Sequence, residues 1–233
     1  MSASATPSEP SPDSAVRIAA RTATILLVFT LVFTALMSGV YQLTQPVLQA
    51  TAADAKRRLI GEVLDPALYD NDLLSDALTL PPLAALGTTE ASQLYRARKN
   101  GAPAALVFEA AAPDGYSGRI GLILAVRADG RLAAVRVTQH KETPGLGDYI
   151  DPKKDKNKAA PWIKQFDGRS LDDPPATKWR VKKDGGAFDQ RTGATISARA
   201  VTHAAARALA WAQAHAERLY TLPAGATFQE NGP

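Results

Sequence analysis

The chain has 233 residues, 45% of them hydrophobic and 21% charged, with a formal net charge of +4. This composition indicates a globular chain of one or two domains. It contains no cysteine, which excludes disulfides, thiolate zinc sites and cysteine-ligated iron–sulfur clusters. The histidines, His140, His203 and His215, are far apart, so we expect no metal. The densest basic stretch, residues 151–158, is diluted by aspartates and favours a solvated loop, so we expect no nucleic-acid partner.

An apolar run near the N-terminus predicts a membrane anchor. No residue from 22 to 53 is charged, and residues 22–43 would form a helix roughly 33 Å long, enough to cross a hydrocarbon core of about 30 Å. We therefore predict a transmembrane helix at residues 21–44, in contact with membrane lipid. The polar, low-complexity composition of residues 1–20 is typical of a disordered tail.

Two properties of this segment stay open from the residues alone. The alternative to an anchor is a cleaved signal peptide, although its most convincing cleavage site, Ala50-Thr51-Ala52, lies well beyond the apolar stretch. Basic residues flank both ends, at positions 17 and 21 and at positions 56–58. The positive-inside rule therefore does not decide which side of the membrane the rest of the chain occupies.

The rest of the chain predicts strands followed by a long helix. We interpret residues 45–100 as a membrane-proximal helical or irregular segment, residues 101–222 as a folded domain and residues 223–233 as a C-terminal tail. The residue pattern predicts strands at 104–110, 120–126, 132–138 and 177–181, a helical turn at 161–166 and an amphipathic helix at 197–219. The predicted fold class is α+β, with an antiparallel sheet and packed helices after one N-terminal transmembrane helix.

Hydroxyls and small residues crowd the start of the predicted C-terminal helix, in the stretch DQRTGATIS at residues 189–197. A helix N-terminus presents unpaired backbone N–H groups and the positive end of the helix dipole, which together favour a bound phosphate. Thr195 and Ser197 lie at or beside the expected cap, while Gly193 and Ala194 leave room for a bulky group. The simpler interpretation is a helix cap alone, because one hydroxyl suffices for that.

A second stretch, HKETPGLGD at residues 140–148, combines a carboxylate, a hydroxyl and two glycines. Such glycines often serve only turns that need a positive φ. The same loop is also suited to press Leu146 and its backbone onto a flat aromatic cofactor, with Glu142 and Thr143 offering hydrogen bonds to its polar edge. Motifs of phosphate-loop, Rossmann, zinc-protease and α/β-hydrolase proteins are absent from the sequence.

Together with GYSGRIGLILAV, PWIKQF, VKKDGGAFDQ and the N-terminal anchor, these two stretches resemble the RnfG subunit family of the Rnf (Rsx) electron-transport complex. The FMN-binding domain of that family is shared with the C subunit of the sodium-pumping NADH:quinone reductase. The resemblance runs from about residue 115 to residue 201. It includes the complete flavin-attachment pattern Asp-x-x-(Ser/Thr)-Gly-Ala-Thr, formed here by Asp189, Thr192, Gly193, Ala194 and Thr195.

The resemblance implies a covalent flavoprotein with FMN as its cofactor. Thr195 would be the residue that a separate flavin transferase esterifies to the phosphate of FMN, within a recognition frame of Asp189, Thr192, Gly193 and Ala194. No residue is expected to act as a catalytic acid, base or nucleophile. The other residues implied to contact FMN are Glu142, Thr143, Gly145 and Leu146 of the flavin-side loop, and Thr192, Gly193, Ala194 and Ser197 around the helix start.

The resemblance also implies a cellular place and partners. The protein would be a single-pass component of the bacterial inner (cytoplasmic) membrane, with a cytoplasmic tail at residues 1–20 and a periplasmic C-terminal domain. Its partners would be the other subunits of a translocase that relays electrons between ferredoxin and NAD and couples this relay to ion transport. Two alternatives stay open: the C subunit of the quinone reductase, with the same FMN linkage, and a non-catalytic anchored accessory subunit of a transport complex.

Overall fold

A computed structural model describes residues 12–230 of the protein, in two compact units that divide between Ala55 and Lys56. Residues 1–11 of the predicted disordered tail, and the last three residues of the predicted C-terminal tail, lie outside the described part. Residues 12–20, which were also assigned to that tail, are helical.

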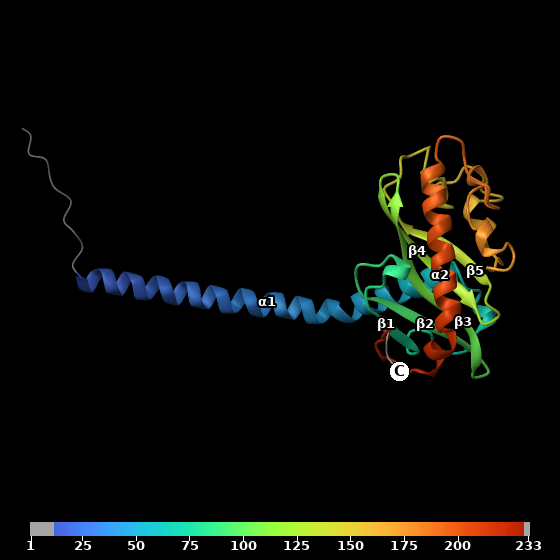
Figure 1. Ribbon diagram of the computed structural model, residues 1–233. Helices are drawn as coiled ribbons and strands as arrows, with labels where there is room; N and C mark the ends of the chain where they lie inside the picture. Colours follow the sequence, from blue (N-terminus) through green and yellow to red (C-terminus); the bar gives the residue numbers. More distant parts are fainter. Residues whose placement is uncertain (1–11, 231–233) are drawn as a thin grey trace, which may run out of the picture. The chain divides into compact units, whose positions relative to one another are not determined.

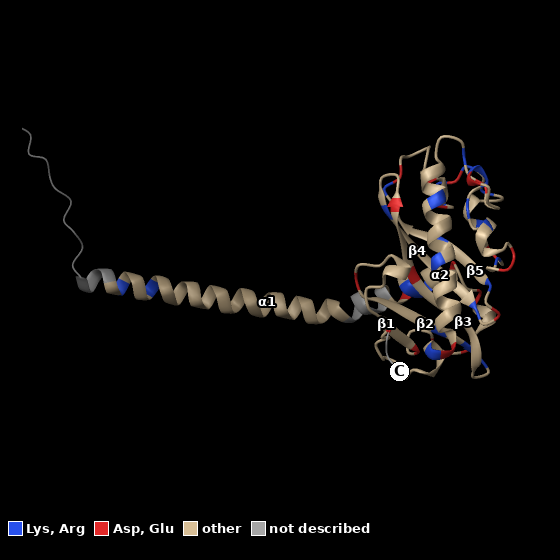
Figure 2. Ribbon diagram, in the orientation of Figure 1, with Lys and Arg blue, Asp and Glu red and all other residues tan. Residues whose placement is uncertain are grey.

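The first unit consists of helix α1 (Pro12–Gly61) up to Ala55. Its span Val16–Gln45 has a mean hydropathy of 2.2, and residues 22–45 carry no charged side chain (Figure 2). The hydroxyls of Thr22, Thr24 and Thr30 each donate to the carbonyl four residues earlier, at 2.8–3.0 Å, so these polar groups are satisfied within the helix. Length and composition fit a single-pass membrane helix.

The second unit is built on a five-stranded antiparallel sheet in which strands follow one another in sequence order (Figure 1). Because short turns join the second strand to the third, the third to the fourth and the fourth to the fifth, these strands form a series of hairpins. The tight turn between the second and third strands uses Asn100 and Gly101, both at positive φ, as such turns require. The strands are β1 (Ala77–Leu80), β2 (Ser92–Lys99), β3 (Ala102–Gly115), β4 (Gly118–Arg127) and β5 (Leu132–Gln139).

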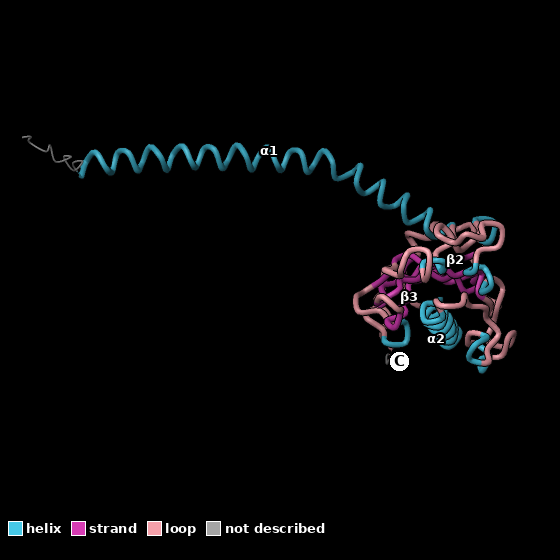
Figure 3. The backbone as a smooth tube through the Cα atoms, turned by 90° about the horizontal axis from the view of Figure 1, so that it is seen from above, coloured by secondary structure: helices cyan, strands magenta, loops and turns pink. Residues whose placement is uncertain are grey.

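Helix α2 (Thr195–Thr221) covers one face of this sheet, as the end-on view of Figure 3 shows. Side chains alternate between the two faces of a strand, and Phe108 of β3 and Leu124 of β4 both point toward α2 in the larger buried cluster. Small helix residues, including Ala205 and Ala208, are fully buried there and let the helix lie close to the strands. This packing fixes the N-terminus of α2 relative to the sheet.

The opposite face of the sheet is covered by the end of α1 and the chain that follows it. Ile60, Val63 and Leu64 form a second buried cluster with Val107 of β3 and Ile123 of β4. Both faces of the central strands are therefore buried. This explains why β4 has a nearly continuous apolar sequence instead of an alternating one.

Several predicted elements are confirmed, and others were missed. The strands expected at 104–110, 120–126 and 132–138, the helical turn at 161–166 and the C-terminal helix are all present. The segment 45–100, interpreted as helical or irregular, contains β1 and β2. The strand expected at 177–181 was wrong, because that stretch begins with a short 3₁₀ helix, Ala176–Lys178, and retains only an isolated bridge between Val181 and Phe188.

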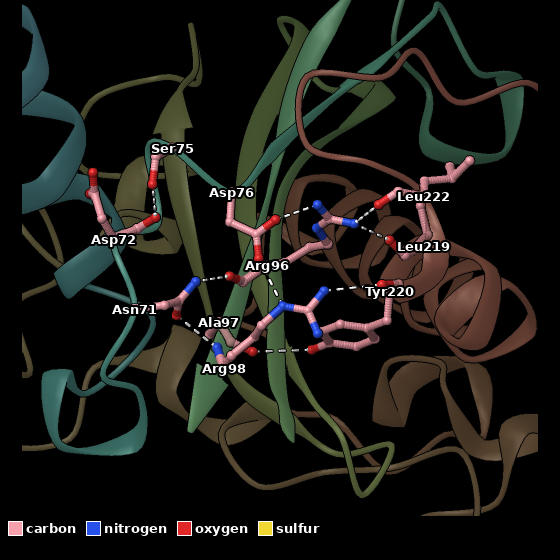
Figure 4. A network of polar contacts seen from close by, with 10 residues as sticks. All are labelled: Asn71, Asp72, Ser75, Asp76, Arg96, Ala97, Arg98, Leu219, Tyr220 and Leu222. Carbon is pink, nitrogen blue, oxygen red and sulfur yellow. Dashed lines mark hydrogen bonds and ion pairs between the residues drawn. The ribbon is translucent and has the colours of Figure 1, made fainter. Parts of the chain in front are cut away.

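The missed strand β2 carries a buried charge network, drawn in Figure 4. Arg96 is only 2% exposed, and its guanidinium pairs with Asp76 and donates to the carbonyls of Leu219 and Leu222. Arg98 binds the second oxygen of Asp76 at 2.8 Å. The last carbonyls of a helix have no partner inside the helix and carry the negative end of its dipole. The two arginines thus hold the C-terminus of α2 against β2.

Candidate cofactor site

Three segments that are distant in sequence meet at the N-terminus of α2 and form a pocket. They are the turn between β3 and β4, the loop at residues 140–148 and the turn that leads into α2. The pocket has an empty volume of about 390 Å³ including its open mouth. Its lining consists of Tyr116, Glu142, Thr143, Leu146, Gly147, Gly193, Ala194, Ile196 and Ser197.

The N-terminus of α2 has no side-chain cap. The residue at the cap position is Ala194, whose side chain cannot accept a hydrogen bond, and Thr195 is the first helical residue. Gly193 precedes them at φ +85°, a conformation that a residue with a Cβ rarely adopts. The interpretation of Thr195 or Ser197 as a helix cap was therefore wrong. Backbone N–H groups of the first helical turn are left for an acceptor outside the helix.

Thr195 lies beside the pocket, between two residues that line it. Its side chain is half-buried, whereas Thr192 and Gly193 are exposed. Ala194 and Ile196 both contribute to the pocket wall. A group joined to the Thr195 hydroxyl would therefore stand next to both the pocket and the free N–H groups.

Glu142 lies at the floor of the pocket and is 3% exposed. One carboxylate oxygen accepts from the Ser197 hydroxyl of α2, and the other accepts from the backbone N–H of Ser117 in the β3–β4 turn at 3.0 Å. A Cβ on Gly147 would lie 2.7 Å from Ser197 Oγ and 2.9 Å from Glu142 Oε2, so a larger residue there would displace these two side chains. This carboxylate joins all three segments of the site.

The mouth of the pocket is apolar. Tyr116 is 64% exposed, Leu146 45% and Ile196 43%. Within the second unit only Leu68 is a comparably exposed large hydrophobic residue among those described. Single exposed apolar side chains are common in proteins, but three around one pocket indicate a surface that an apolar ligand or partner covers.

The turn that carries Gly193 and Ala194 is supported from below by Tyr149. Its hydroxyl donates to the carbonyl of Ala194 at 3.1 Å and accepts from the backbone N–H of Arg191 at 3.2 Å. Burial raises the pKa of Tyr149, against the opposing effects of the Arg191 N–H and charge. The phenol therefore stays protonated over the physiological range and keeps its donor role.

A second support comes from Asp155, in the stretch expected to be a solvated loop. Its side chain is 1% exposed, pairs with Arg191 and accepts from the backbone N–H of Trp162 at 2.7 Å. Burial alone would raise the pKa of Asp155, but the N–H donors of Trp162 and Asn157 and the charge of Arg191 outweigh it and lower that pKa. No pattern in the lysine-rich stretch distinguished this aspartate, so the sequence interpretation missed it.

The structure brings together six of the residues implied to contact the cofactor, and it places the others around the pocket. Gly145, Thr192 and Thr195 are not in its lining, although all three lie on the segments that form it. Asp189 is exposed and pairs with Lys182 at 2.6 Å, while its carbonyl accepts from Trp162 Nε1 at 2.6 Å. Gly147 and Ile196 line the pocket and were missed. Their roles depend on contacts across the fold.

The chemistry of the site suits a ligand with an anionic end and a flat apolar body. Free N–H groups at a helix start bind phosphate, and the three apolar side chains at the mouth suit an aromatic ring. Glycines at positions 145 and 193, at φ +75° and +85°, carry no side chain that would obstruct the approach. Among the described residues no cluster of histidine and carboxylate side chains could hold a metal ion.

Comparisons with known proteins agree with this geometry. The FMN-binding domain family matches residues 115–210, and the RnfG N-terminal region matches residues 14–63, which include the whole apolar helix span. The chain is 44% identical over 199 residues to the G subunit of the ion-translocating oxidoreductase complex of Pseudomonas aeruginosa, covering 85% of this chain and 91% of that protein. The proteins of the same name from Cronobacter sakazakii and Photorhabdus laumondii are 44% and 42% identical over 85% and 84% of this chain, and 92% and 91% of theirs.

Proposed function

This chain belongs to the RnfG family, the G subunits of ion-translocating oxidoreductase complexes, and from that premise we propose that it carries FMN covalently, through a phosphoester to Thr195. In this role it relays electrons between ferredoxin and NAD as part of the complex, coupled to ion translocation. FMN supplies the ability to exchange one or two electrons. The protein supplies the attachment, the orientation and the electrostatic surroundings.

The observation that carries the proposal is the uncapped start of α2 beside a half-buried threonine hydroxyl. The transferase would move the flavin phosphoryl group from an activated flavin donor to the Thr195 hydroxyl: the bond between phosphorus and the donor's leaving group breaks, the leaving group departs, and the hydroxyl proton is released. The product has the mass of the protein plus FMN less one water. The first-turn N–H groups of α2, which no side chain caps, would hold the phosphate of the bound cofactor. Within the DQRTGATIS stretch, Thr195 is the residue that has a hydroxyl and lies at the first helical position of α2, beside the pocket.

The walls of the pocket suit the remainder of the cofactor. Leu146 and Ile196 offer apolar contact, and Tyr116 offers an aromatic face at the exposed mouth. Glu142 and Thr143 offer hydrogen-bonding groups to the polar edge of the ring. A ring held at an open mouth is accessible to a redox partner in a neighbouring subunit.

Attachment requires a transferase that can reach the site. Asp189, Thr192 and Gly193 are exposed, so much of the recognition frame is available at the surface. We assign this exposed stretch as the surface that the flavin transferase binds. Because the ester holds the cofactor permanently, the domain keeps its flavin in a compartment where free FMN is not replenished.

The apolar span of α1 and membership of the family support a proposal for the location. Helix α1 anchors the protein as a single-pass component of the bacterial inner membrane, in contact with lipid and retained after translocation rather than cleaved as a signal peptide. The FMN-binding domain lies in the periplasm, and the N-terminal tail lies in the cytoplasm. The partners are the other subunits of the complex and, during maturation, the transferase.

Intact mass and flavin fluorescence test the covalent linkage. The full chain is purified from membranes of cells that contain the transferase, beside Thr195→Ala, Thr195→Ser and Thr143→Ala. We expect the wild type and Thr143→Ala to gain the mass of one FMN less water and to fluoresce on a denaturing gel, Thr195→Ser to retain part of the signal and Thr195→Ala to lose both. Thr143→Ala is the matched control because it removes another hydroxyl from the same pocket.

An unmodified, colourless wild type from such cells would overturn the proposal and favour an anchored accessory subunit without a cofactor. The electron relay has a separate test. Membranes that contain the complete complex with Thr195→Ala in this protein should lose ferredoxin-dependent reduction of NAD, while membranes with Glu109→Gln, which changes an exposed carboxylate outside the pocket, keep it. Equal rates in both would exclude this flavin from the electron path.

A further inference from the structure

The buried carboxylate of Glu142 has no counter-ion. Its partners are the Ser197 hydroxyl and the Ser117 N–H, which are both neutral donors, and its own backbone N–H donates to His140 Nδ1 at 3.2 Å. No lysine, arginine or histidine in residues 12–230 forms an ion pair with it. Each carboxylate oxygen accepts one hydrogen bond.

The titratable groups on the segments packed around Glu142 leave that charge uncompensated. His140 and Lys141 are on its own loop, Tyr149 and Asp151 follow it, Asp114, Tyr116 and Arg119 are on the β3–β4 hairpin, and Arg191 precedes α2. His140 faces Asp151 at 3.9 Å, and Arg191 is paired with Asp155. His140 and Arg191 thus face other carboxylates, and Lys141 and Arg119 are exposed to solvent.

A buried carboxylate without a counter-ion costs free energy. Because Glu142 lies in the wall of the pocket, its charge acts on any ligand in the pocket. We propose that Glu142 is a positioning and charge-setting residue, which makes reduction of the bound flavin take up two protons with two electrons and lowers the flavin's midpoint potential. This inference rests on the proposed FMN site and deepens it.

The charge of the reduced flavin determines whether Glu142 raises or lowers the midpoint potential. Oxidised flavin that gains two electrons and one proton becomes an anion, and a second proton makes it neutral. A fixed negative charge nearby disfavours the anion and favours uptake of the second proton, as one carboxylate raises the pKa of another. The apolar mouth formed by Tyr116, Leu146 and Ile196 excludes water once covered, which strengthens the effect.

Potentiometry of the full-length flavinylated protein in detergent tests this. The midpoint potential of the bound FMN is followed by its absorbance from about pH 5 to about pH 9 in the wild type, Glu142→Gln, Glu142→Asp and Glu109→Gln. Glu142→Gln should raise the midpoint potential at neutral pH. It should also lower, by about one pH unit, the pH at which uptake falls from two protons to one per two electrons.

The two other variants separate charge from structure. Glu142→Asp keeps the negative charge, so it should restore most of the wild-type potential and slope, which a purely structural role would not predict. Glu109→Gln removes an exposed carboxylate of β3 outside the pocket and should change neither. Unchanged potentials and slopes in Glu142→Gln would overturn the inference.

Two further measurements distinguish failure of the inference about Glu142 from failure of the proposed FMN attachment. Intact mass shows whether each protein carries FMN, and a wild type without FMN refutes the proposed function itself. If Glu142→Gln does not fold or does not acquire flavin, the wild type is compared with free FMN in the same cell. The bound flavin should keep two-proton uptake to a higher pH than free FMN, and the same or a lower pH would contradict the role of Glu142.

Discussion

The Tyr149 hydroxyl and the Ala194 carbonyl form a 3.1 Å hydrogen bond between residues 45 positions apart. Because the same hydroxyl accepts from Arg191 N, Tyr149 holds both ends of the turn that precedes α2. The conformation of this turn sets the direction of the first helical N–H groups. The attachment site therefore depends on a side chain outside the motif by which the site is recognised.

Replacing Tyr149 with phenylalanine should weaken this turn. The change leaves the Arg191 N–H without a partner and removes one of the donors to the Ala194 carbonyl, which costs about 1–3 kcal/mol in unfolding free energy, and it should lower the fraction of chains that acquire FMN. Urea unfolding followed by tryptophan fluorescence and intact mass measure the two effects. Tyr69→Phe makes the same chemical change away from the pocket and should leave the flavin content unaltered; equal behaviour of the two variants would contradict the role of Tyr149.

Substitution of Asp155 with asparagine should cost stability in a pH-dependent manner. The lowered pKa of Asp155 means that its ionised form stabilises the folded state above the unfolded pKa of about 3.9 and that this contribution is lost as pH falls through the folded pKa. At neutral pH we expect a loss of about 1–3 kcal/mol. The gap from the wild type should narrow below about pH 4.

Unfolding curves at several pH values measure this gap. Glu90→Gln, which neutralises an exposed carboxylate, is the control and should stay close to the wild type at every pH. A gap for Asp155→Asn that stays constant into the acid range would show that the charge of Asp155 is not the source of its effect.

Arg96→Met should be more destabilising than the substitutions at Tyr149, Asp155 and Gly193. The change leaves Leu219 and Leu222 carbonyls without a donor at the end of α2 and removes one partner of Asp76, and the expected loss is about 3 kcal/mol. Arg127→Met breaks an arginine–aspartate pair whose two side chains are both more than 40% exposed and should cost less than about 1 kcal/mol. The denaturant midpoints of the two variants measure this difference in stability. Equal midpoints would contradict the prediction.

Gly193→Ala should reduce flavin attachment, and the loss of folding stability alone should not account for that reduction. Alanine at φ +85° costs about 1–2 kcal/mol in strain, and its Cβ would lie 3.6 Å from Leu146 Cδ1, at the mouth of the pocket. Gly101→Ala is the matched control, because it has φ +78° and open space around the added Cβ. Both variants should lose similar stability, but only Gly193→Ala should lose FMN by intact mass; equal flavin contents would refute this prediction.

The elements that were predicted correctly are those determined by the residue pattern within their own segment. The β4–β5 hairpin and α2 follow from periodicity within each segment, and the apolar span of α1 follows from composition. Strand β2 was missed because Arg96 and Arg98 make it look polar. Their burial becomes possible only through Asp76 and through helix carbonyls more than 120 residues away, and no local pattern contains those partners.

Part of the pocket lining was also named from the sequence. Glu142, Leu146, Gly193 and Ser197 were named from motifs and do line one pocket. The supports beneath them were not, because Tyr149 and Asp155 owe their roles to burial and to partners across the fold. Thr195 was expected at or beside the helix cap and does follow it directly. The alternative that its hydroxyl or that of Ser197 caps the helix was wrong, because the cap residue is Ala194, whose side chain leaves the first N–H groups free.

Helix α2 is held at both ends, by Ser197 on Glu142 near its start and by Arg96 on the carbonyls at its end. Each residue added to a helix moves its end by about 1.5 Å and turns it by roughly 100°. A single insertion or deletion between these two clamps would therefore turn one of them away from its partner, while many substitutions on the exposed side would leave both in place. The length of α2 is as much a part of the site as the identity of its threonine.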